Sequence, residues 1–339
     1  RHHLKRSRIG GLRRERTIRR WAVGVGLLIA AGGVAAVVIW AVHGFAIGPV
    51  PLWQDVRLPA PAYFNELASR LQNKSGAPHS FLLGRHYTGG WWPFFLVAFA
   101  VKTPLATLLI IGMAVADMIH RRDVRFADSI LLIVSGVYFV AASLSDFNRG
   151  YRYILPVVPF LFILAGRASR LKWGPSTNQS RSWLRYAHAV LLIWLAVATG
   201  VIYPDFLAYF NEIVGPANGY HVLVDSSLDW GQDLPALARY VAEEGIASVY
   251  LSWFGEARPI HYGIPHRFIP SKPDELSDVH TRVYHPDYPP PGTYAISATN
   301  LQGLLFDDHD VFDFFLEREP IAQPGYSIML YDVPRLLDP

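Results

Sequence analysis

The sequence predicts a polytopic α-helical membrane protein with about five transmembrane helices and a C-terminal soluble α/β domain. Apolar residues make up 51% of the 339 residues and charged residues only 17%, whereas about a quarter of a typical soluble protein is charged. The long apolar runs all lie before residue 203, and the charges divide at the same point. Residues 1–202 hold 24 Lys and Arg against 7 Asp and Glu, and residues 203–339 hold 7 against 20.

The distribution of charge argues against nucleic-acid binding, and the lack of cysteine excludes several kinds of chemistry. The positive charge of the first part lies between the apolar runs, as expected for a membrane protein. The net charge of +4 therefore does not indicate nucleic-acid binding. The chain has no cysteine, which excludes disulfides, thiol catalysis and cysteine-ligated metals.

Membrane spans need roughly 20 mainly apolar residues. The predicted spans are 21–45, a segment within 91–119, 127–144, 153–168 and 186–201. The second is interrupted by Lys102, Thr103 and Pro104. It is either one tilted helix, or a short helix at the membrane surface over 91–101 followed by a span that starts at Thr103. We favour the second interpretation, because proline is common at the start of a helix.

The orientation follows from the basic residues in short loops. The N-terminal arm 1–20 and the loops 119–126 and 167–186 hold 9, 3 and 5 Lys and Arg, against 4 and 2 in the loops 46–90 and 145–152. The first set, which includes the basic arm, is therefore expected in the cytoplasm. With five spans in the region 21–202, the acidic domain 203–339 is expected outside the cytoplasm, and the chain in the plasma membrane.

Two segments are expected to fold outside the membrane. In the outer loop 46–90, an amphipathic stretch after two prolines predicts a short helix over 62–73. In the C-terminal domain, alternating strand and helix patterns predict a small βαβ-type sheet. We expect strands over 221–226, 247–255, 292–299 and 326–333, helices over 233–244 and 312–318, and irregular structure over 257–291.

Three basic residues near the predicted outer surface are candidates for binding a lipid phosphate. Arg149 and Arg152 precede the fourth span, and Lys102 lies at the break in the second. Arginine can hold phosphate oxygens with two parallel hydrogen bonds. The alternatives are that the arginines anchor their loop to headgroups or nearby acids, and that Lys102 only extends to the membrane surface.

The segment VDSSLDWGQDL (224–234) carries the other candidate site residues. Asp225, Asp229 and Asp233 follow one another at four-residue spacing, with Trp230 and Gln232 between them. Three carboxylates could bind a divalent cation, or hydrogen-bond sugar hydroxyl groups beside a stacking tryptophan. The alternative is structural: Asp225 ends a strand, and Asp229 or Asp233 caps the following helix.

Aromatic and histidine residues gather before the second predicted span, over 79–95. Such residues are typical anchors at the membrane interface. The alternative is a role in substrate binding, for which His86 and Tyr87 are candidates. His79 and His86, or His261 and His266, could in principle bind a metal, but we expect the histidines to be ordinary surface residues, because no H-E-x-x-H motif is present.

Four strings together resemble the C-terminal half of a family of membrane glycosyltransferases: LLGRHYTGGWWPFFLVAFAVKTPL (82–105), NRGYRYILPVVPFLFILAGRAS (148–169), YFNEIVGP (209–216) and VDSSLDWGQDLPALARYV (224–241). These are the phospholipid-carrier-dependent enzymes of glycosyltransferase family 39, which have the GT-C fold. They are similar to protein O-mannosyltransferases and to the aminoarabinose transferase of lipid A. The resemblance runs from about residue 44 to the end of the chain.

The resemblance implies transfer of a sugar from a polyprenyl-phosphate donor to an acceptor at the outer membrane face, with inversion. An acidic residue activates the acceptor, and basic groups stabilise the leaving lipid phosphate, a role that suits Arg149, Arg152 and Lys102. In this family the acidic residue lies in the first outer loop, and nothing in this chain corresponds to it. We therefore expect the chain to be the C-terminal portion of such an enzyme, without its catalytic acid. The alternative is a non-catalytic membrane subunit or an extracytoplasmic protein that binds a glycan or a partner.

Overall fold

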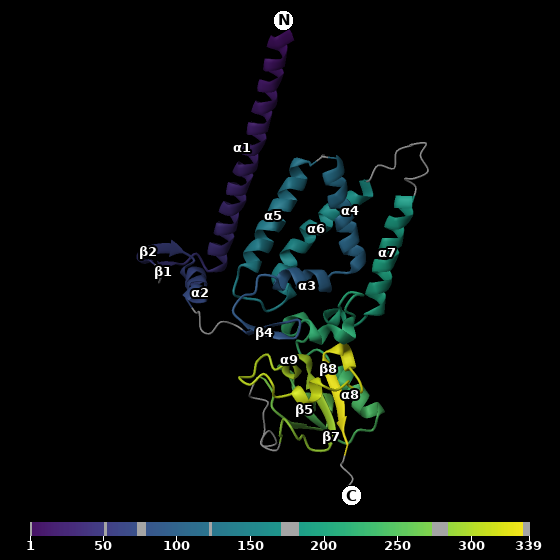
Figure 1. The fold of residues 1–339 in the computed structure, drawn as a ribbon. Helices are drawn as coiled ribbons and strands as arrows, with labels where there is room; N and C mark the ends of the chain where they lie inside the picture. Colours follow the sequence, from purple (N-terminus) through teal and green to yellow (C-terminus); the bar gives the residue numbers. More distant parts are fainter. Residues whose placement is uncertain are drawn as a thin grey trace. The chain divides into compact units, whose positions relative to one another are not determined.

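The computed structural model describes residues 2–50, 53–72, 79–121, 124–170, 183–272 and 284–334. The chain forms two units, 1–76 and 77–339, and each is described by itself (Figure 1).

The first unit consists of a long helix, a two-stranded hairpin and a short helix. α1 covers His2–Val42, and its part Ala22–Val42 is long and apolar enough to cross a membrane. The strands β1 (Ile47–Val50) and β2 (Trp53–Pro59) pair antiparallel. α2 (Pro61–Gln72) confirms the helix that the sequence predicts over 62–73.

The second unit begins with the antiparallel hairpin of β3 (His79–Leu82) and β4 (Arg85–Thr88). Apolar helices follow: α3 (Phe94–Lys102), α4 (Leu105–Arg121), α5 (Phe126–Ser143), a 3₁₀ helix (Tyr151–Val157) that continues into α6 (Val158–Ala165), and α7 (Trp183–Val201). Figure 1 shows α3 lying across the ends of α4, α5 and α6.

Several of these helices could span a membrane. α5 and the stretch Tyr151–Ala168 are long and apolar enough, and α3 and α4 are so as a pair bent by 110°. α7 contains a shorter apolar stretch, Tyr186–Val201. Together with Ala22–Val42, the described residues hold three candidate spans, or four if the bent pair counts as one. The helix break that the sequence predicts at residues 102–104 is confirmed.

The helix α4 packs closely against α6 and α7. Ala106, Ile110 and Ala114 lie one turn apart on α4 and are buried against the following residues of the other helices: Ala165, Ala168 and Leu191. Small side chains let helix backbones approach one another, which favours packing between helices in a membrane.

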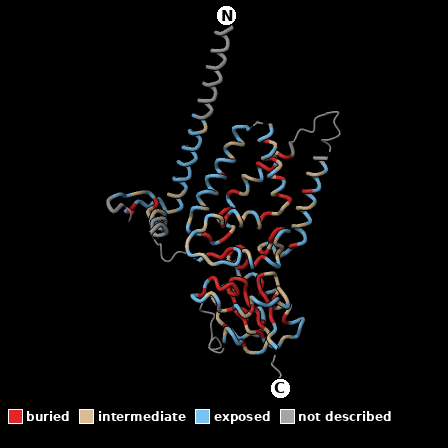
Figure 2. The backbone as a smooth tube through the Cα atoms, in the orientation of Figure 1, coloured by how far each residue is buried: buried red, intermediate tan, exposed pale blue. Residues whose placement is uncertain are grey.

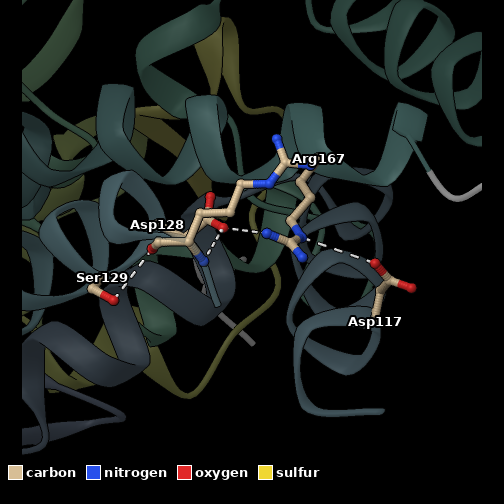
Figure 3. Close-up of polar contacts among 5 residues, drawn as sticks. Asp117, Asp128, Ser129 and Arg167 are labelled. Atoms are coloured by element: carbon tan, nitrogen blue, oxygen red, sulfur yellow. Dashed lines mark hydrogen bonds and ion pairs between the residues drawn. The ribbon is translucent and has the colours of Figure 1, made fainter. Parts of the chain in front are cut away.

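Arg167, which follows α6, joins α4 and α5 (Figure 3). Its guanidinium group forms an ion pair with Asp128 near the start of α5, and its Nε lies 3.9 Å from Asp117 of α4. Asp128 also accepts a hydrogen bond from the backbone N–H of Arg125 at 3.1 Å. The charge of Asp117, which lies inside an apolar run, is thus compensated by a basic residue from another helix.

The C-terminal part contains a four-stranded mixed sheet in the order β6-β5-β7-β8. The strands are β5 (Val249–Ser252), β6 (His266–Phe268), β7 (Gly292–Ser297) and β8 (Ile328–Val333). β5 is parallel to both β6 and β7, and β8 is antiparallel to β7. α8 (Leu234–Glu243), α9 (Ala298–Leu301) and α10 (Asp313–Leu316) complete it.

Each face of this sheet has its own hydrophobic core. Ala295 of β7 packs with Leu237 of α8 on one face. Its neighbours Tyr294 and Ile296 point to the other face, because side chains alternate along a strand, and share a core with Phe95 of α3. The second core therefore runs from the sheet to the apolar helices. In Figure 2 the buried residues concentrate in this part of the chain, whereas α5 and α7 are largely exposed.

The structure confirms most of the predicted elements of the domain and corrects two. α8, β5, β7, α10 and β8 lie within the ranges expected for them. The strand predicted over 221–226 is wrong, because this segment forms 3₁₀ turns and Asp225 has a φ of +54°. β6 lies in a stretch expected to be irregular, and residues 273–283 of that stretch lie outside the described residues.

Candidate functional site

Residues 148–152, here called the arginine loop, are fastened to two neighbouring segments. The side chain of Asn148 donates a hydrogen bond to the carbonyl oxygen of Trp91 at 2.9 Å. Ser226 donates from its hydroxyl group to the carbonyl oxygen of Arg149. The hydroxyl oxygen of Ser227 accepts from the backbone N–H of Tyr151 at 3.2 Å. The two motifs that the sequence singled out, 148–153 and 224–234, are therefore in direct contact.

Gly150 makes this close contact possible. Its φ is +147°, a region that favours glycine. A Cβ atom at this position would lie 2.2 Å from the hydroxyl oxygen of Ser226. Any larger residue would therefore separate the arginine loop from Ser226.

The two arginines of the loop are exposed and lie over aromatic rings. The guanidinium carbon of Arg149 is 5.9 Å from the ring centre of Phe147. That of Arg152 is 5.2 Å from the ring of Tyr153 and 5.1 Å from the exposed ring of Trp230. Attraction between a cation and an aromatic face orients both guanidinium groups, while their N–H donors stay accessible to an anion.

A cavity of about 240 Å³ lies beside the arginine loop. Its lining is mainly aromatic and apolar: Phe95, Tyr138, Ala141, Ala142, Ser145, Phe147 and Tyr153. Phe147 and Tyr153 are the two rings of this lining that carry Arg149 and Arg152. The site therefore combines an apolar cavity with two positive charges at its margin.

Asp225 is the carboxylate that faces these charges. Its backbone N–H donates to the hydroxyl oxygen of Thr299 at 3.0 Å. Burial raises the pKa of Asp225, while a hydrogen bond from the backbone of Ser226 and the charges of Arg149 and Arg152 lower it. The predicted strand end is not present, and Asp225 instead begins a 3₁₀ turn beside the arginine loop.

Asp229 and Asp233 are buried, at 0% and 5% exposure. The carboxylate of Asp229 accepts hydrogen bonds from the backbone N–H groups of Gly231 at 3.1 Å and Thr299 at 3.4 Å. Burial raises the pKa of Asp229 to about 7 and that of Asp233 to about 6. Asp233 stands at the N-cap of α8, but its side chain makes no capping hydrogen bond. Asp229 therefore joins the turn at Gly231 to the start of α9.

Gln232, by contrast, forms its hydrogen bonds within its own turn. Its side chain accepts a hydrogen bond from the backbone N–H of Trp230 at 2.8 Å and donates to the carbonyl oxygen of Leu228 and the carboxylate of Asp233. Trp230 remains 53% exposed. Among the described side chains, no group of three or more His, Asp or Glu is arranged to hold a metal ion.

Lys102 lies behind the arginine loop. Its ammonium group donates to the carbonyl oxygens of Leu207 at 2.8 Å and Ser227 at 2.6 Å, and lies 4.3 Å from the ring centre of Phe210. Two of its three N–H donors are therefore used by the backbone. These contacts favour a structural role, in which Lys102 holds Ser227 in place. Direct binding of a lipid phosphate by Lys102 stays a prediction.

His86 and Tyr87 of β4 contact different parts of the chain. The ring of Tyr87 stacks on that of Trp91 at 4.4 Å, so it belongs to the segment that Asn148 holds. His86 contacts His309 and the carbonyl oxygen of Gln302. Tyr87 is thus closer in the network to the arginine loop than His86.

Asn211 and Glu212 support the site and were not among its predicted residues. Asn211, which is fully buried, donates to the carbonyl oxygens of Ala100 at 2.5 Å and Thr103 at 3.1 Å. Glu212 accepts from the backbone N–H of Leu105 at 3.4 Å and from the indole of Trp194 at 2.7 Å. These two residues satisfy the backbone groups that the break between α3 and α4 leaves without helical partners. Both residues lie in the string YFNEIVGP (209–216), which is one of the four strings that carry the family resemblance.

Comparison of the chain with models of protein families, with curated proteins and with solved structures finds no match in any of the three.

Proposed function

We propose that the chain is the C-terminal portion of a membrane glycosyltransferase that uses a sugar linked to polyprenyl phosphate. The observation that carries this proposal is the aromatic cavity with Arg149 and Arg152 at its margin. A polyprenyl phosphate has an apolar chain and an anionic head, which match the cavity and the two guanidinium groups respectively. Guanidinium groups bind phosphate with geometric specificity.

The proposed function also requires the five predicted spans to lie in a membrane, and exposed aromatic residues near the helix ends support this. Trp92, Tyr203 and Phe206 are 62%, 72% and 52% exposed and lie near the ends of α3 and α7. Exposed aromatic residues of this kind gather at the boundary between lipid and water. We infer that the arginine loop lies near this boundary on the outer side, where a lipid phosphate would be found, and that the sheet domain is extracytoplasmic.

The proposal gives each residue a role. Arg149 and Arg152 bind the phosphate and stabilise its charge as it leaves the sugar. Trp230, which carries Arg152, offers an exposed ring beside the phosphate for the sugar. No residue of this chain is proposed as the acid that activates the acceptor.

Binding of undecaprenyl phosphate to the full chain in detergent, followed by native mass spectrometry, tests the proposal. Arg152→Ala should weaken binding at least about tenfold, because a hydrogen bond to a charged group contributes about 1.5–3 kcal/mol. Arg239→Ala, at an exposed position on α8, is the matched control and should bind as the unaltered chain does. Equal affinity of Arg152→Ala and the unaltered chain would contradict the assignment.

A second comparison separates the enzyme from its alternative, a non-catalytic subunit or glycan-binding protein. Undecaprenol, which lacks the phosphate, should bind less tightly than undecaprenyl phosphate and should not distinguish Arg152→Ala from the unaltered chain. In a full-length enzyme, Arg152→Ala should also sharply reduce sugar transfer from the polyprenyl-phosphate donor. A chain that ignores the phosphate but binds soluble glycans would favour the alternative.

A further inference from the structure

Three histidines form a cluster that the proposed function does not use. His79 and His86 lie on the same face of the β3–β4 hairpin, since His79 pairs with Thr88 and Phe81 with His86 in the antiparallel register. His309, from the segment after α9, lies against this face. Its ring stacks on His86 with the centres 4.0 Å apart and the planes 8° apart, and meets His79 edge-on at 5.5 Å.

Hydrogen bonds to two consecutive carbonyl groups determine where the protons lie. Nε2 of His86 is 2.6 Å from the carbonyl oxygen of Gln302, and Nδ1 of His309 is 2.7 Å from that of Gly303. A carbonyl oxygen only accepts, so each of these nitrogens carries its hydrogen in the neutral ring. The remaining nitrogen of each ring, Nδ1 of His86 and Nε2 of His309, is the one that takes up a proton in acid.

The stacked arrangement suits neutral rings and opposes the charged form. Two protonated imidazoles with centres 4.0 Å apart repel each other, and His86 is half-buried, so it is poorly hydrated when charged. Burial and the neighbouring His309 and His79 lower the pKa of His86, while the hydrogen bond to Gln302 and the charge of Asp310 raise it. Asp310 is the acidic group that opposes the effect, and the net shift is downward.

We propose that His79, His86 and His309 form an acid-sensitive contact that holds the β3–β4 hairpin to residues 302–310 when neutral and loosens when protonated. The contact reaches the arginine loop through adjacent residues: Tyr87 follows His86 and stacks on Trp91, whose carbonyl oxygen binds Asn148. Loosening the hairpin therefore loosens one of the three attachments of the arginine loop. The inference stands on the histidine geometry and does not depend on the proposed enzymatic activity.

The direction of the pH effect follows from the linkage between proton binding and the stability of the folded state. A histidine whose pKa is lower in the folded state destabilises that state as the pH falls below 6.5, the value of the unfolded chain. Each unit of depression corresponds to about a tenfold shift between the closed and open contact at low pH. The contact is closed at neutral and alkaline pH.

Hydrogen exchange of the full chain in lipid nanodiscs tests the proposal. Protection of the peptides covering 79–88 and 302–310, corrected for intrinsic exchange, should fall on acidification from about pH 7.5 to about pH 5, a range that brackets the ordinary histidine pKa. His86→Phe keeps a stacking ring but cannot be protonated, and it removes the histidine whose pKa burial lowers, so the fall in its protection on acidification should be much smaller. His261→Phe, at an exposed histidine of the same domain, should behave as the unaltered chain.

Two outcomes overturn the proposal: protection in the unaltered chain that does not change with pH, or a pH dependence that His86→Phe retains in full. If His86→Phe does not fold, His309→Phe takes its place: it removes the second charge of the stack, so the fall in protection should be smaller than in the unaltered chain.

Discussion

The ammonium nitrogen of Lys102 lies 2.6 Å from the carbonyl oxygen of Ser227, which is 125 residues further along the chain. The hydroxyl group of Ser227 binds the backbone of Tyr151. One serine therefore connects the end of α3 to the arginine loop. The lysine contributes to the site by holding this serine in place.

Replacing Lys102 by methionine should destabilise the chain. The variant keeps an unbranched side chain but leaves the carbonyl oxygens of Leu207 and Ser227 without their donor, at about 1–3 kcal/mol for each buried unsatisfied group. Thermal unfolding in detergent measures the effect. Arg239→Met removes an exposed positive charge from α8 and should leave the midpoint unchanged. A midpoint for Lys102→Met equal to that of this control would show that the contact is not stabilising.

Asn211→Ala should destabilise the bend between α3 and α4. The variant removes the donor for the carbonyl oxygens of Ala100 and Thr103, and we expect a loss of about 2–4 kcal/mol in the free energy of unfolding. Asn218→Ala is the matched control, because Asn218 donates a similar hydrogen bond to Val214 but is exposed. Chemical denaturation of both variants gives the comparison, and similar losses in the two would refute a special role for Asn211.

Gly150→Ala should displace the arginine loop from Ser226. The added Cβ would lie 2.2 Å from the serine hydroxyl oxygen, so the loop must move and affinity for undecaprenyl phosphate should fall. Gly245→Ala controls for the backbone cost, since Gly245 also has a positive φ, but a Cβ atom added there would meet no heavy atom within 4 Å. Undiminished binding by Gly150→Ala would show that this close packing is not needed for the site.

Asp229 should make the stability of the chain fall as the pH rises. Its pKa is raised to about 7 from 3.8, so the folded state binds more protons than the unfolded state between these values, and stability decreases over that range. The midpoint of unfolding, measured from about pH 5 to about pH 8 across the upper part of this range, should decline more steeply in the unaltered chain than in Asp229→Asn. Asp332→Asn, at an exposed position, should follow the unaltered chain. Parallel profiles for the unaltered chain and Asp229→Asn would contradict the assignment.

The helices could be predicted largely because their signals are local. Pro104 indicates the break between α3 and α4. The apolar stretches of α1, α5 and α7 are long enough to predict helices without information from the rest of the chain. The strand predicted over 221–226 is wrong because a short apolar run does not distinguish a strand from turns that bury the same residues. Leu223 and Val224 are indeed buried, but they pack in the core between the sheet and α3 without forming a strand.

The site was predictable in its residues and less so in its geometry. The arginine motif and the segment 224–234 could be selected from the sequence, and the resemblance implied that both lie at the outer face. The sequence does not reveal that Asp229 and Gln232 are used internally, because their partners are mainly backbone groups. The roles of Lys102 and Asn211 depend on residues more than a hundred positions away, which no local pattern contains.

The capping of α3 by Asn211 has a consequence for biosynthesis. Asn211 follows Ala100 by 111 residues, and the core that encloses Phe95 is completed by Met329 near the end of the chain. During translation, the bend between α3 and α4 must therefore wait, uncapped, until the chain beyond α7 has been made. The apolar helices and the sheet domain thus reach their final packing together, at a late stage of synthesis, rather than as independently folding modules.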